Sequence, residues 1–223
     1  FNLRKGTFFP VAGDAGKSNI SDIHEDSENQ VWVTSYGGRV LRTGPLRRLW
    51  ASFNTDDKGV RLSSALCVLE DVNGNICVGT DDGLLVYDEE KRAFVNTEVN
   101  LPDRTGRISV SSMEQDRNGN IWAAGDFGIM CIDGSDNHVG TYFKSQEDLD
   151  HNVFLHGSSL RLADGTIFFG GTNGICHFRP EEFENNHHAA EVVISEVYVN
   201  GNPLRQDVAN ITIPVKFESE ENN

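Results

Sequence analysis

The chain has 223 residues and a formal net charge of −15, from 34 acidic and 19 basic side chains. Such an acidic balance argues against a nucleic-acid partner, because binding to phosphates needs a basic face. No window approaches the ~18 consecutive apolar residues of a membrane-spanning helix, so we also expect no direct membrane insertion. A chain of this length predicts one or two domains.

Short apolar segments recur along the chain at a nearly constant interval. They begin at Val31, Ile76, Ile121 and Ile167, which are spaced by 45, 45 and 46 residues. Seven residues after each start stands a glycine, namely Gly38, Gly83, Gly128 and Gly174. Two residues before each start stands a turn residue that tolerates positive φ, namely Asn29, Gly74, Gly119 and Gly165. Features held in register in this way indicate a tandem repeat.

Each unit has the pattern of four short strands joined by tight turns. In the second unit the apolar runs cover 64–69, 76–79, 84–87 and 93–95, and Asn-Gly and Asp-Gly signals separate the first three. A four-stranded sheet of about 45 residues, which cannot bury both of its faces alone, is typical of a β-propeller blade. The predicted fold is therefore all-β, with about four four-stranded blades over residues 18–178.

The alternative architecture is a two-sheet sandwich, which also uses short strands at regular spacing. A sandwich gives no reason to keep one glycine at the same offset in every unit. A propeller normally closes into a ring, and a partial ring exposes two apolar sheet faces. We therefore expect self-association, packing against the remaining blades of a parent propeller, or a small closed ring of four blades.

The repeat residues also carry a recognisable pattern. An acidic residue precedes a Gly-Asn turn, an apolar-Trp-apolar strand follows, and Gly-Thr and Gly-Leu come after it. The second unit shows it as Glu70-Asp71, Gly74-Asn75, Ile76-Cys77-Val78, Gly79-Thr80 and Gly83-Leu84. This pattern resembles the two-component regulator propeller repeat. Cys77 and Phe168 replace the tryptophan, which argues against that position as a shared ligand contact.

The segments outside the repeats have a different composition. Residues 1–17 resemble the outer strand of a preceding blade with its connection, and residues 179–190 form a polar linker. Residues 191–223 resemble the beginning of the immunoglobulin-like Y_Y_Y module that follows propellers of the same family. That module needs ~100 residues, so only its first strands are expected. The chain is interpreted as a fragment of a larger protein.

The chemistry-bearing residues fit structural roles. Asp26, Asp71 and Asp116 precede Asn- or Gly-rich turns, where aspartate caps local backbone N–H groups. The cysteines lie in strands without a Cys-x-x-Cys element, which predicts small buried hydrophobes; they are Cys67, Cys77, Cys131 and Cys176. The oxygen-rich stretch 146–152 lacks the spacing of a calcium loop. We therefore expect no catalytic residues, no metal site and no cofactor.

The remaining candidate is a binding surface. In a meander blade, the turns between the second and third strands lie at the same end as the crossovers between blades, and loops on a rigid scaffold tend to carry function. Polar side chains beside aromatic rings suit a sugar, whose hydroxyls pair with Asp and Asn while its C–H faces rest on rings. The candidate ligand-binding residues are Tyr36, Asp82, Arg104, Asp126, Phe127 and Asn173.

The resemblance implies a function. It points to the periplasmic sensor region of a hybrid two-component system regulator, in which a non-catalytic ectodomain detects an oligosaccharide and signals to a histidine kinase. One alternative is a propeller enzyme, a lyase or hydrolase acting on a glycan or lactone, which requires a histidine and a carboxylate converging on the central channel. A second alternative is a scaffold whose blades serve protein contacts only.

Overall fold

The computed structural model describes residues 19–44, 50–97, 99, 101, 108–133, 139–184, 198–199 and 202–203. Residues 1–185 form one compact unit and residues 186–223 a second. The strands of the first unit fall into four antiparallel sheets. Blade 1 contains β1 (Ile20–Glu25), β2 (Val31–Ser35), β3 (Arg39–Thr43) and β4 (Trp50–Phe53), and blade 2 contains β5 (Ala65–Glu70), β6 (Ile76–Thr80), β7 (Gly83–Asp88) and β8 (Ala93–Thr97). Blade 3 contains β9 (Val110–Gln115), β10 (Ile121–Gly125), β11 (Gly128–Ile132) and β12 (Val139–Lys144), and blade 4 contains β13 (Phe154–Arg161), β14 (Ile167–Gly171) and β15 (Gly174–Phe178).

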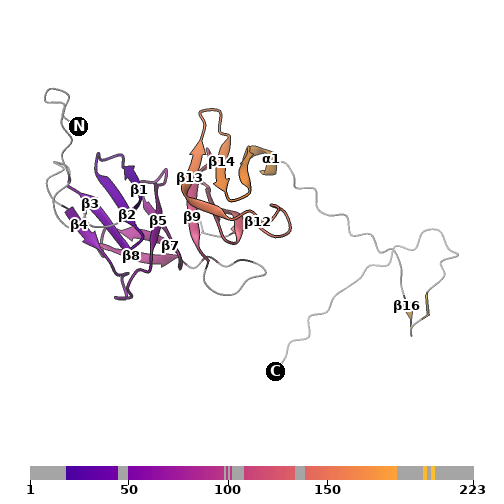
Figure 1. Ribbon diagram of the computed structural model, residues 1–223, viewed down its shortest axis with the longest axis horizontal. Coiled ribbons are helices and arrows are strands. Elements are labelled where there is room, and N and C mark those ends of the chain that lie inside the picture. Colours follow the sequence, from indigo (N-terminus) through magenta and orange to yellow (C-terminus); the bar gives the residue numbers. More distant parts are fainter. Residues whose placement is uncertain are drawn as a thin grey trace. The chain divides into compact units, whose positions relative to one another are not determined.

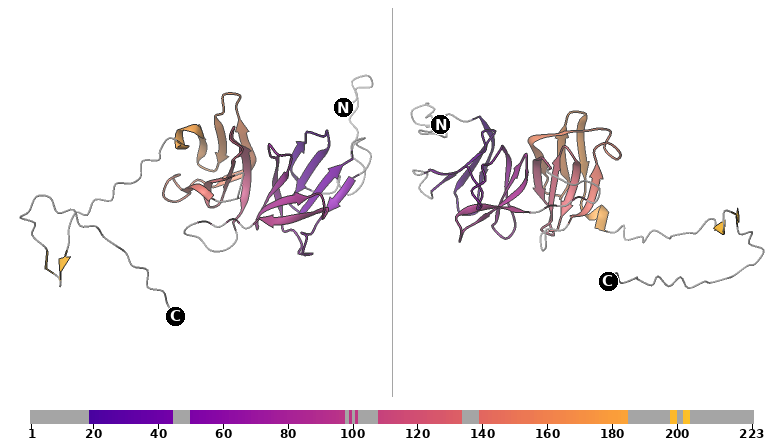
Figure 2. Two further views of the ribbon diagram at one scale, coloured as in Figure 1. Left: turned by 180° about the vertical axis from the view of Figure 1, so that it is seen from behind. Right: turned by 90° about the horizontal axis from the view of Figure 1, so that it is seen from below.

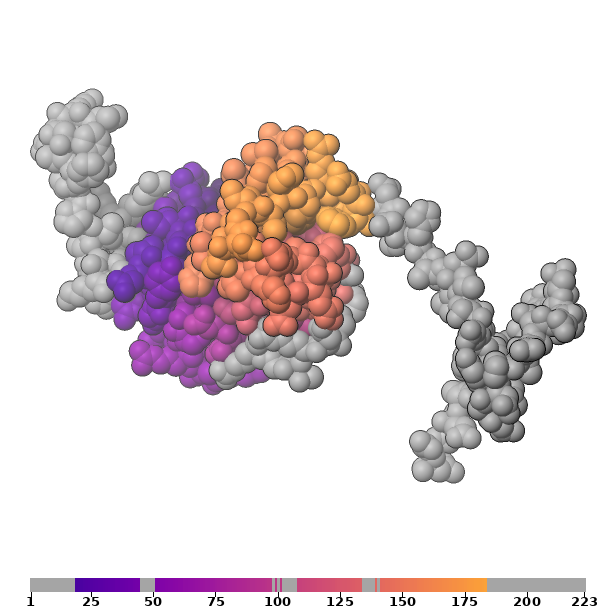
Figure 3. Space-filling view, turned by 45° about the vertical axis from the view of Figure 1, so that its right-hand side comes forward, coloured from indigo at the N-terminus to yellow at the C-terminus, as the bar shows by residue number. Residues whose placement is uncertain are grey.

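The four sheets are arranged as propeller blades around their first strands. The first strands β1, β5, β9 and β13 are the innermost, with β5 beside both β1 and β9, and β13 beside β9 (Figures 1 and 2). Blade 4, in orange, lies next to blade 1, in indigo (Figure 3). The predicted all-β propeller fold is confirmed.

The fourth blade differs from the other three. Within the described residues it has three strands, where the sequence predicted four. A short helix, α1 (Glu181–Glu184), follows β15. Its Phe183 ring packs 5.6 Å from Trp122 and 5.0 Å from Phe143, so this turn covers aromatic side chains of blade 3. No helix in the described part of the chain is long and apolar enough to cross a membrane.

The second unit is described only at a short hairpin. β16 (Tyr198–Val199) pairs with β17 (Asn202–Pro203) in antiparallel register. Most of residues 191–223 and all of residues 1–17 lie outside the described residues, so the immunoglobulin-like module and the preceding outer strand stay predictions.

Three apolar cores lie between successive blades. Between blades 1 and 2 the core contains Trp32, Val78 and Phe94, and between blades 2 and 3 it contains Cys77, Ala123 and Met130. Between blades 3 and 4 it is built of aromatic and branched residues that include Trp122, Phe154, Ile167 and Phe169. Each core draws residues from two sheets, so the facing sides of successive blades bury each other.

Aspartate side chains cap the backbone N–H groups of the turns between first and second strands, as predicted. We call this arrangement the aspartate clasp. Asp116 Oδ1 accepts hydrogen bonds from the backbone N–H of Asn118 and of Asn120, both at 2.9 Å. Its Oδ2 accepts a 3.0 Å bond from Trp122 Nε1. Asp26 makes the same bond to Trp32 at 2.8 Å, so each clasp also satisfies a buried indole. In blade 2 the sixth residue after Asp71 is Cys77, and this indole bond has no counterpart there.

The repeat glycines adopt the predicted backbone conformations. The residues two before each second strand have positive φ, namely Asn29 at 61°, Gly74 at 83°, Gly119 at 91° and Gly165 at 96°. Gly83, Gly128 and Gly174 begin their third strands with φ of 121°, 125° and 109°. Gly38, at 66°, instead ends a turn that is one residue longer. The equal offset in the sequence therefore hides a shift of register in blade 1.

Inner strands are tied to one another at one repeat position. Asp22 Oδ2 accepts a 3.0 Å bond from Val68 N in the next blade. Ser112, at the equivalent position of blade 3, donates to Leu155 O at 2.7 Å and accepts from Ser158 N at 3.0 Å. These bonds hold the inner strands of blades 1 and 2, and of blades 3 and 4, in register with each other.

The clasp generates a stability prediction with an internal control. Asp116→Ala leaves the indole N–H of Trp122, 2% exposed, without its partner and removes the turn cap, so unfolding free energy should fall by about 3 kcal/mol. Asp71→Ala removes a cap of the same type from an exposed turn and should cost about 1 kcal/mol. Urea unfolding followed by tryptophan fluorescence measures both. Equal losses would contradict the role of the indole bond.

The glycines generate a second matched pair. Gly83→Ala meets open space and should cost about 1–2 kcal/mol, because L-residues rarely adopt this φ. Gly128→Ala has the same φ, but its Cβ would strike the backbone carbonyl of Phe143, so a further loss of about 2 kcal/mol is expected. Thermal unfolding of the two variants compares them directly, and an equal effect would show that only φ matters.

Candidate functional site

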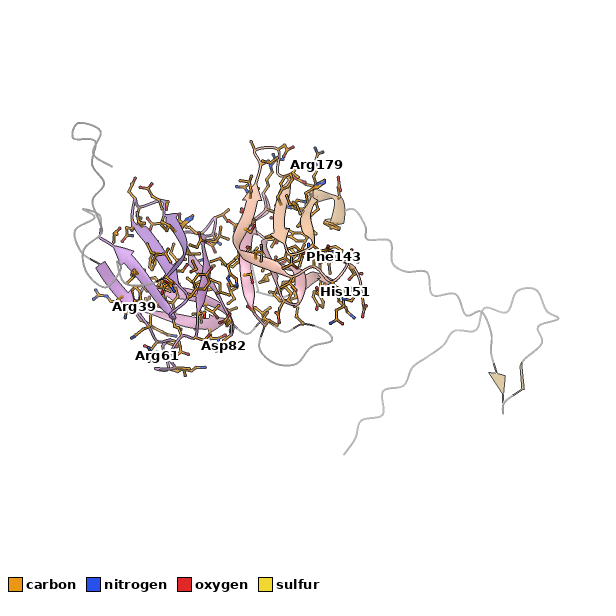
Figure 4. All side chains as sticks on the ribbon, viewed as in Figure 1. Arg39, Arg61, Asp82, Phe143, His151 and Arg179 are labelled. Atoms are coloured by element: carbon orange, nitrogen blue, oxygen red, sulfur yellow. The ribbon has the colours of Figure 1, made fainter. Side chains whose placement is uncertain are left out.

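The predicted site residues gather at one end of the propeller. This turn end carries the turns between second and third strands (36–38, 81–82, 126–127 and 172–173) and the crossovers between blades. Asp82 and His151 lie at this end in Figure 4, while Arg179 lies at the other. Tyr36, Asp82, Asp126, Phe127 and Asn173 all occupy these turns. Arg104 lies outside the described residues.

Asn173 and Asp82 are held by local contacts. Asn173 Nδ2 donates to Asp150 Oδ2 at 2.9 Å, and its backbone N–H donates to Asn152 Oδ1 at 2.8 Å. The backbone N–H of Asp82 donates to Thr80 Oγ1 at 3.1 Å. Asn173 is thus held against the crossover before blade 4, and Asp82 in a tight two-residue turn.

Asp126 is the predicted residue with the most developed surroundings. Its Oδ1 accepts a 3.2 Å bond from the backbone N–H of Ser109, whose hydroxyl lies 3.5 Å from Asp81 Oδ1. Ser109 therefore stands between carboxylates of blades 2 and 3. Asp126 also lines a cavity of about 430 Å³ at the turn end of blade 3. The other lining residues are Phe127, Tyr142, Lys144, Ser145, Gln146 and Glu147.

Phe127 has a different environment from the one predicted. Its side chain is 3% exposed and belongs to the core between blades 2 and 3. The Tyr142 ring lies 6.4 Å from it, and the Tyr142 hydroxyl donates to the Phe127 carbonyl at 3.2 Å. The accessible aromatic group of this cavity is therefore Tyr142, which is half-buried and lies on β12, a strand the sequence did not single out.

Tyr36 closes the turn end between the first and last blades. Its ring lies 5.4 Å from that of His156, and its hydroxyl lies 3.3 Å from His156 Nδ1. These residues are separated by 120 positions in the sequence, so the contact joins blade 1 to blade 4. It could not be foreseen from repeat spacing, because it joins the first and last blades and not successive ones.

A second cavity, of about 380 Å³, lies at the opposite end between blades 1 and 2. Arg42 lines it, and the Arg42 guanidinium stacks over Trp32 at 5.0 Å and over Tyr87 at 5.4 Å. Arg42 also donates to Gln30 Oε1 at 2.7 Å and pairs with Glu89 at 2.8 Å. The N–H donors and both faces of the Arg42 guanidinium are engaged in these contacts. Arg42, Gln30 and Glu89 therefore cover the edge of the aromatic core with polar groups.

The described residues offer no reactive thiolate and no cluster of metal ligands. Burial raises the pKa of the Cys67 thiol, and it raises that of Cys77 to about 12, so both stay protonated. Three of the cysteines are buried, Cys176 is half-buried, and all four are free. Within the described residues, no group of three or more His, Cys, Asp or Glu side chains is placed to hold a metal ion.

Glu114 brings a carboxylate into the contact between blades 3 and 4. It lies on β9 opposite Trp122 and is half-buried. Burial raises its pKa, although a hydrogen bond with Ser159 and the charge of Arg161 act in the opposite direction. The inner strands therefore carry one carboxylate that tends toward the neutral form.

Comparison with known proteins agrees with this fold. No protein-family model matches the chain. The chain is 26% identical to histidine kinase P4 of Formosa agariphila over 111 residues, which cover 49% of this chain and 8% of the kinase. It also matches the extracellular domain of a B. thetaiotaomicron protein described as a hybrid two-component system, with a TM-score of 0.65, 26% identity, and coverage of 88% of this chain and 26% of that one.

Two further solved structures share the fold. The extracellular domain of a second such B. thetaiotaomicron protein matches with a TM-score of 0.59 and 17% identity over 72% of this chain and 21% of that one. A virginiamycin B lyase of Staphylococcus aureus matches with a TM-score of 0.55 and 14% identity over 76% of this chain and 58% of that one. At these identities the likeness concerns the fold alone.

The resemblance predicted from the repeats is confirmed. The chain is a propeller segment similar to the extracellular domains of hybrid two-component systems, and its sequence is similar to part of a histidine kinase. It spans about a quarter of the first extracellular domain and less than a tenth of the kinase.

Glu114 generates a pH prediction. Its folded-state pKa is raised above the ordinary 4.5, so the folded state holds more protons than the unfolded state and stability falls as pH rises from about 4.5 through the folded value. Glu114→Gln removes this decline, so its stability relative to the natural chain should grow between pH 4.5 and 7. Urea unfolding at both values measures the difference. A constant difference would contradict a raised pKa.

Proposed function

We propose that this chain is part of the extracytoplasmic sensor region of a hybrid two-component system, and that it binds a ligand without transforming it. The observation that carries this proposal is the 26% identity to an extracellular domain of that class over 88% of the chain, on a shared propeller fold. The partial identity to a histidine kinase supports the same class. On this proposal the chain acts in the periplasm, as part of the ectodomain of an inner-membrane protein.

The proposed ligand is an oligosaccharide, bound at the turn end. The cavity beside Asp126 offers carboxylate, amide, hydroxyl and ammonium groups from Asp126, Gln146, Ser145 and Lys144, together with the Tyr142 ring. Sugar hydroxyls both donate and accept hydrogen bonds, so a mixed set of this kind matches them. The volume of this cavity, about 430 Å³, falls in the usual range for small-molecule sites. Asp82 and Asn173 would extend the surface along neighbouring blades.

A binding event at this end could be transmitted without catalysis. A ligand that binds one arrangement of the ectodomain better than another shifts the population toward it, by as much as the difference in affinity. In the proposed architecture the immunoglobulin-like module would pass that bias toward the membrane. The proposal therefore needs two arrangements and one ligand, and no chemical step.

Asp126→Ala tests the site. Removing a charged acceptor from a sugar hydroxyl should weaken binding about tenfold or more, because hydrogen bonds to charged groups contribute about 1.5–3 kcal/mol. The measurement is calorimetric titration with the oligosaccharide that gives the largest thermal shift in a panel. At a hundred times Kd, a ligand should raise the stability of the natural chain by about 2.7 kcal/mol.

The matched control is Glu90→Ala, an exposed carboxylate in the turn after β7 at the opposite end of blade 2. It changes the net charge by the same amount and should leave affinity unchanged. Equal weakening by both variants would indicate a general charge effect and reject the site. A panel that shifts neither this chain nor a longer ectodomain containing it would reject the oligosaccharide class.

A further inference from the structure

A third cavity lies beside the 380 Å³ cavity between blades 1 and 2. It has a volume of about 590 Å³, and both cavities are lined by Gln30, Arg42, Tyr87 and Glu89. The further residues that line the larger cavity are Thr43, Gly44, Ala51, Phe53 and Arg92. Its volume is in the usual range for small-molecule sites.

The two neighbouring cavities differ in charge. The smaller one has a single cation, Arg42, and its carboxylates are those of Asp26, Glu28, Glu70 and Glu89. The larger one has two arginines, Arg42 and Arg92, and the carboxylate of Glu89. Its lining is therefore positive in a chain whose net charge is −15. Because salt screens charges beyond about 8 Å at physiological ionic strength, the charges closest to a ligand determine its preference, and here they favour an anion.

Arg42 is held in a position that suits a carboxylate. Its Nε donates to Gln30 Oε1 at 2.7 Å, and its plane lies over the rings of Trp32 and Tyr87. Its Nη2 pairs with Glu89 at 2.8 Å, although the Glu89 side chain is 66% exposed and that of Arg42 only 18%. A planar guanidinium fixed in this way binds a carboxylate through parallel hydrogen bonds. Glu89 is thus a surface carboxylate that a ligand carboxylate can replace.

Arg92 occupies a position where the backbone favours another residue type. It ends the turn between β7 and β8 with a φ of 51°, in the left-handed region that glycine and asparagine adopt most readily. Residues with long side chains are rare in this region, and strained residues cluster at ligand sites. The chain therefore has a cation at the edge of the cavity although asparagine would suit the turn better.

The cavity also has an apolar wall. The rings of Phe53 and Tyr87 lie 5.3 Å apart in an edge-to-face arrangement, and Ala51 lines the cavity with them. Phe53 is only half-buried, so part of its ring is open to a ligand. The C–H face of a sugar ring packs well on such a surface.

We propose that this cavity is a second binding site, which takes a small sugar acid. The carboxylate of the ligand displaces Glu89 and pairs with Arg42 and Arg92, while the sugar ring packs on Phe53 and Ala51. Glu89 then acts as a competitor that is part of the chain itself. The site is separate from the cavity beside Asp126 and does not depend on the function proposed for that cavity.

The experiment is a titration of the full chain with galacturonate, followed through the indole N–H signals in ¹H–¹⁵N spectra. The Trp32 signal should move, because Arg42 lies over this ring, whereas the signal of Trp122, between blades 3 and 4, should stay. Galactose, which has a hydroxymethyl group in place of the carboxylate, should move neither signal at the same concentrations. Equal shifts with both sugars, or no shift of Trp32 with galacturonate, would overturn the proposal.

Two variants separate binding from stability, and both leave Arg42 on the aromatic core. Arg92→Asn relieves the turn and should unfold at a temperature no lower than the natural chain. It should nevertheless bind galacturonate about tenfold more weakly, because it loses a hydrogen bond between charged groups. Glu89→Gln removes the competing carboxylate and should strengthen binding about threefold, because a like charge beside the ligand is lost.

The matched control is Glu90→Gln, which removes the same charge from the same exposed turn but lies outside the cavity lining. It should bind galacturonate like the natural chain. Equal effects of Glu89→Gln and Glu90→Gln would indicate a general charge effect and reject the displacement of Glu89. Unchanged affinity in Arg92→Asn would reject the pairing of the ligand with Arg92.

Discussion

Every blade of this propeller depends on its neighbours, because a single sheet has two faces and no second layer of its own to cover them. Trp32 shows how that dependence is met. Its ring lies 5.2 Å from Tyr87 and 6.2 Å from Phe94, both in blade 2, while its indole N–H is bonded to Asp26 in its own blade. The aspartate clasp thus lets a large aromatic group be buried without an unpaired donor. Turn chemistry and blade packing are parts of one arrangement.

Much of this arrangement could be predicted from the sequence, because its determinants are local. A glycine at positive φ and an aspartate that caps two backbone N–H groups depend on residues within a few positions of one another. The repetition of these turn residues at a fixed interval then predicts the number and the positions of the blades. The turn at 36–38 shows the limit of such reasoning, because one added residue shifts the register of β3 while the spacing of Gly38 stays the same.

The candidate site was less predictable, because it depends on contacts that do not repeat. Phe127 was expected at the surface since it occupies a turn, yet its ring turns into the core beneath Tyr142. Arg42 has no sequence signal, since its stacking on Trp32 and Tyr87 requires both the register of β3 and the approach of blade 2. Position within a turn indicates which end of the propeller a residue occupies. It does not determine whether the side chain points outward.

Residues that break the repeat also affect stability. At one inner-strand position, which pairs with the bulky residue of the second strand, the four blades carry His24, Leu69, Glu114 and Leu160. Leu69 packs against the core between blades 2 and 3, whereas His24 and Glu114 place polar groups between blades. His24 Nε2 is buried without a hydrogen bond in the described structure, and burial raises the pKa of Glu114.

A buried polar group without full compensation lowers stability, so these two residues oppose the packing that holds the blades together. Natural sequences depart from local consistency most often where another requirement acts. His24 and Glu114 therefore identify the contacts between blades 1 and 2 and between blades 3 and 4 as those where packing alone does not account for the sequence. The contact between blades 2 and 3, which carries Leu69, follows the apolar pattern at this position.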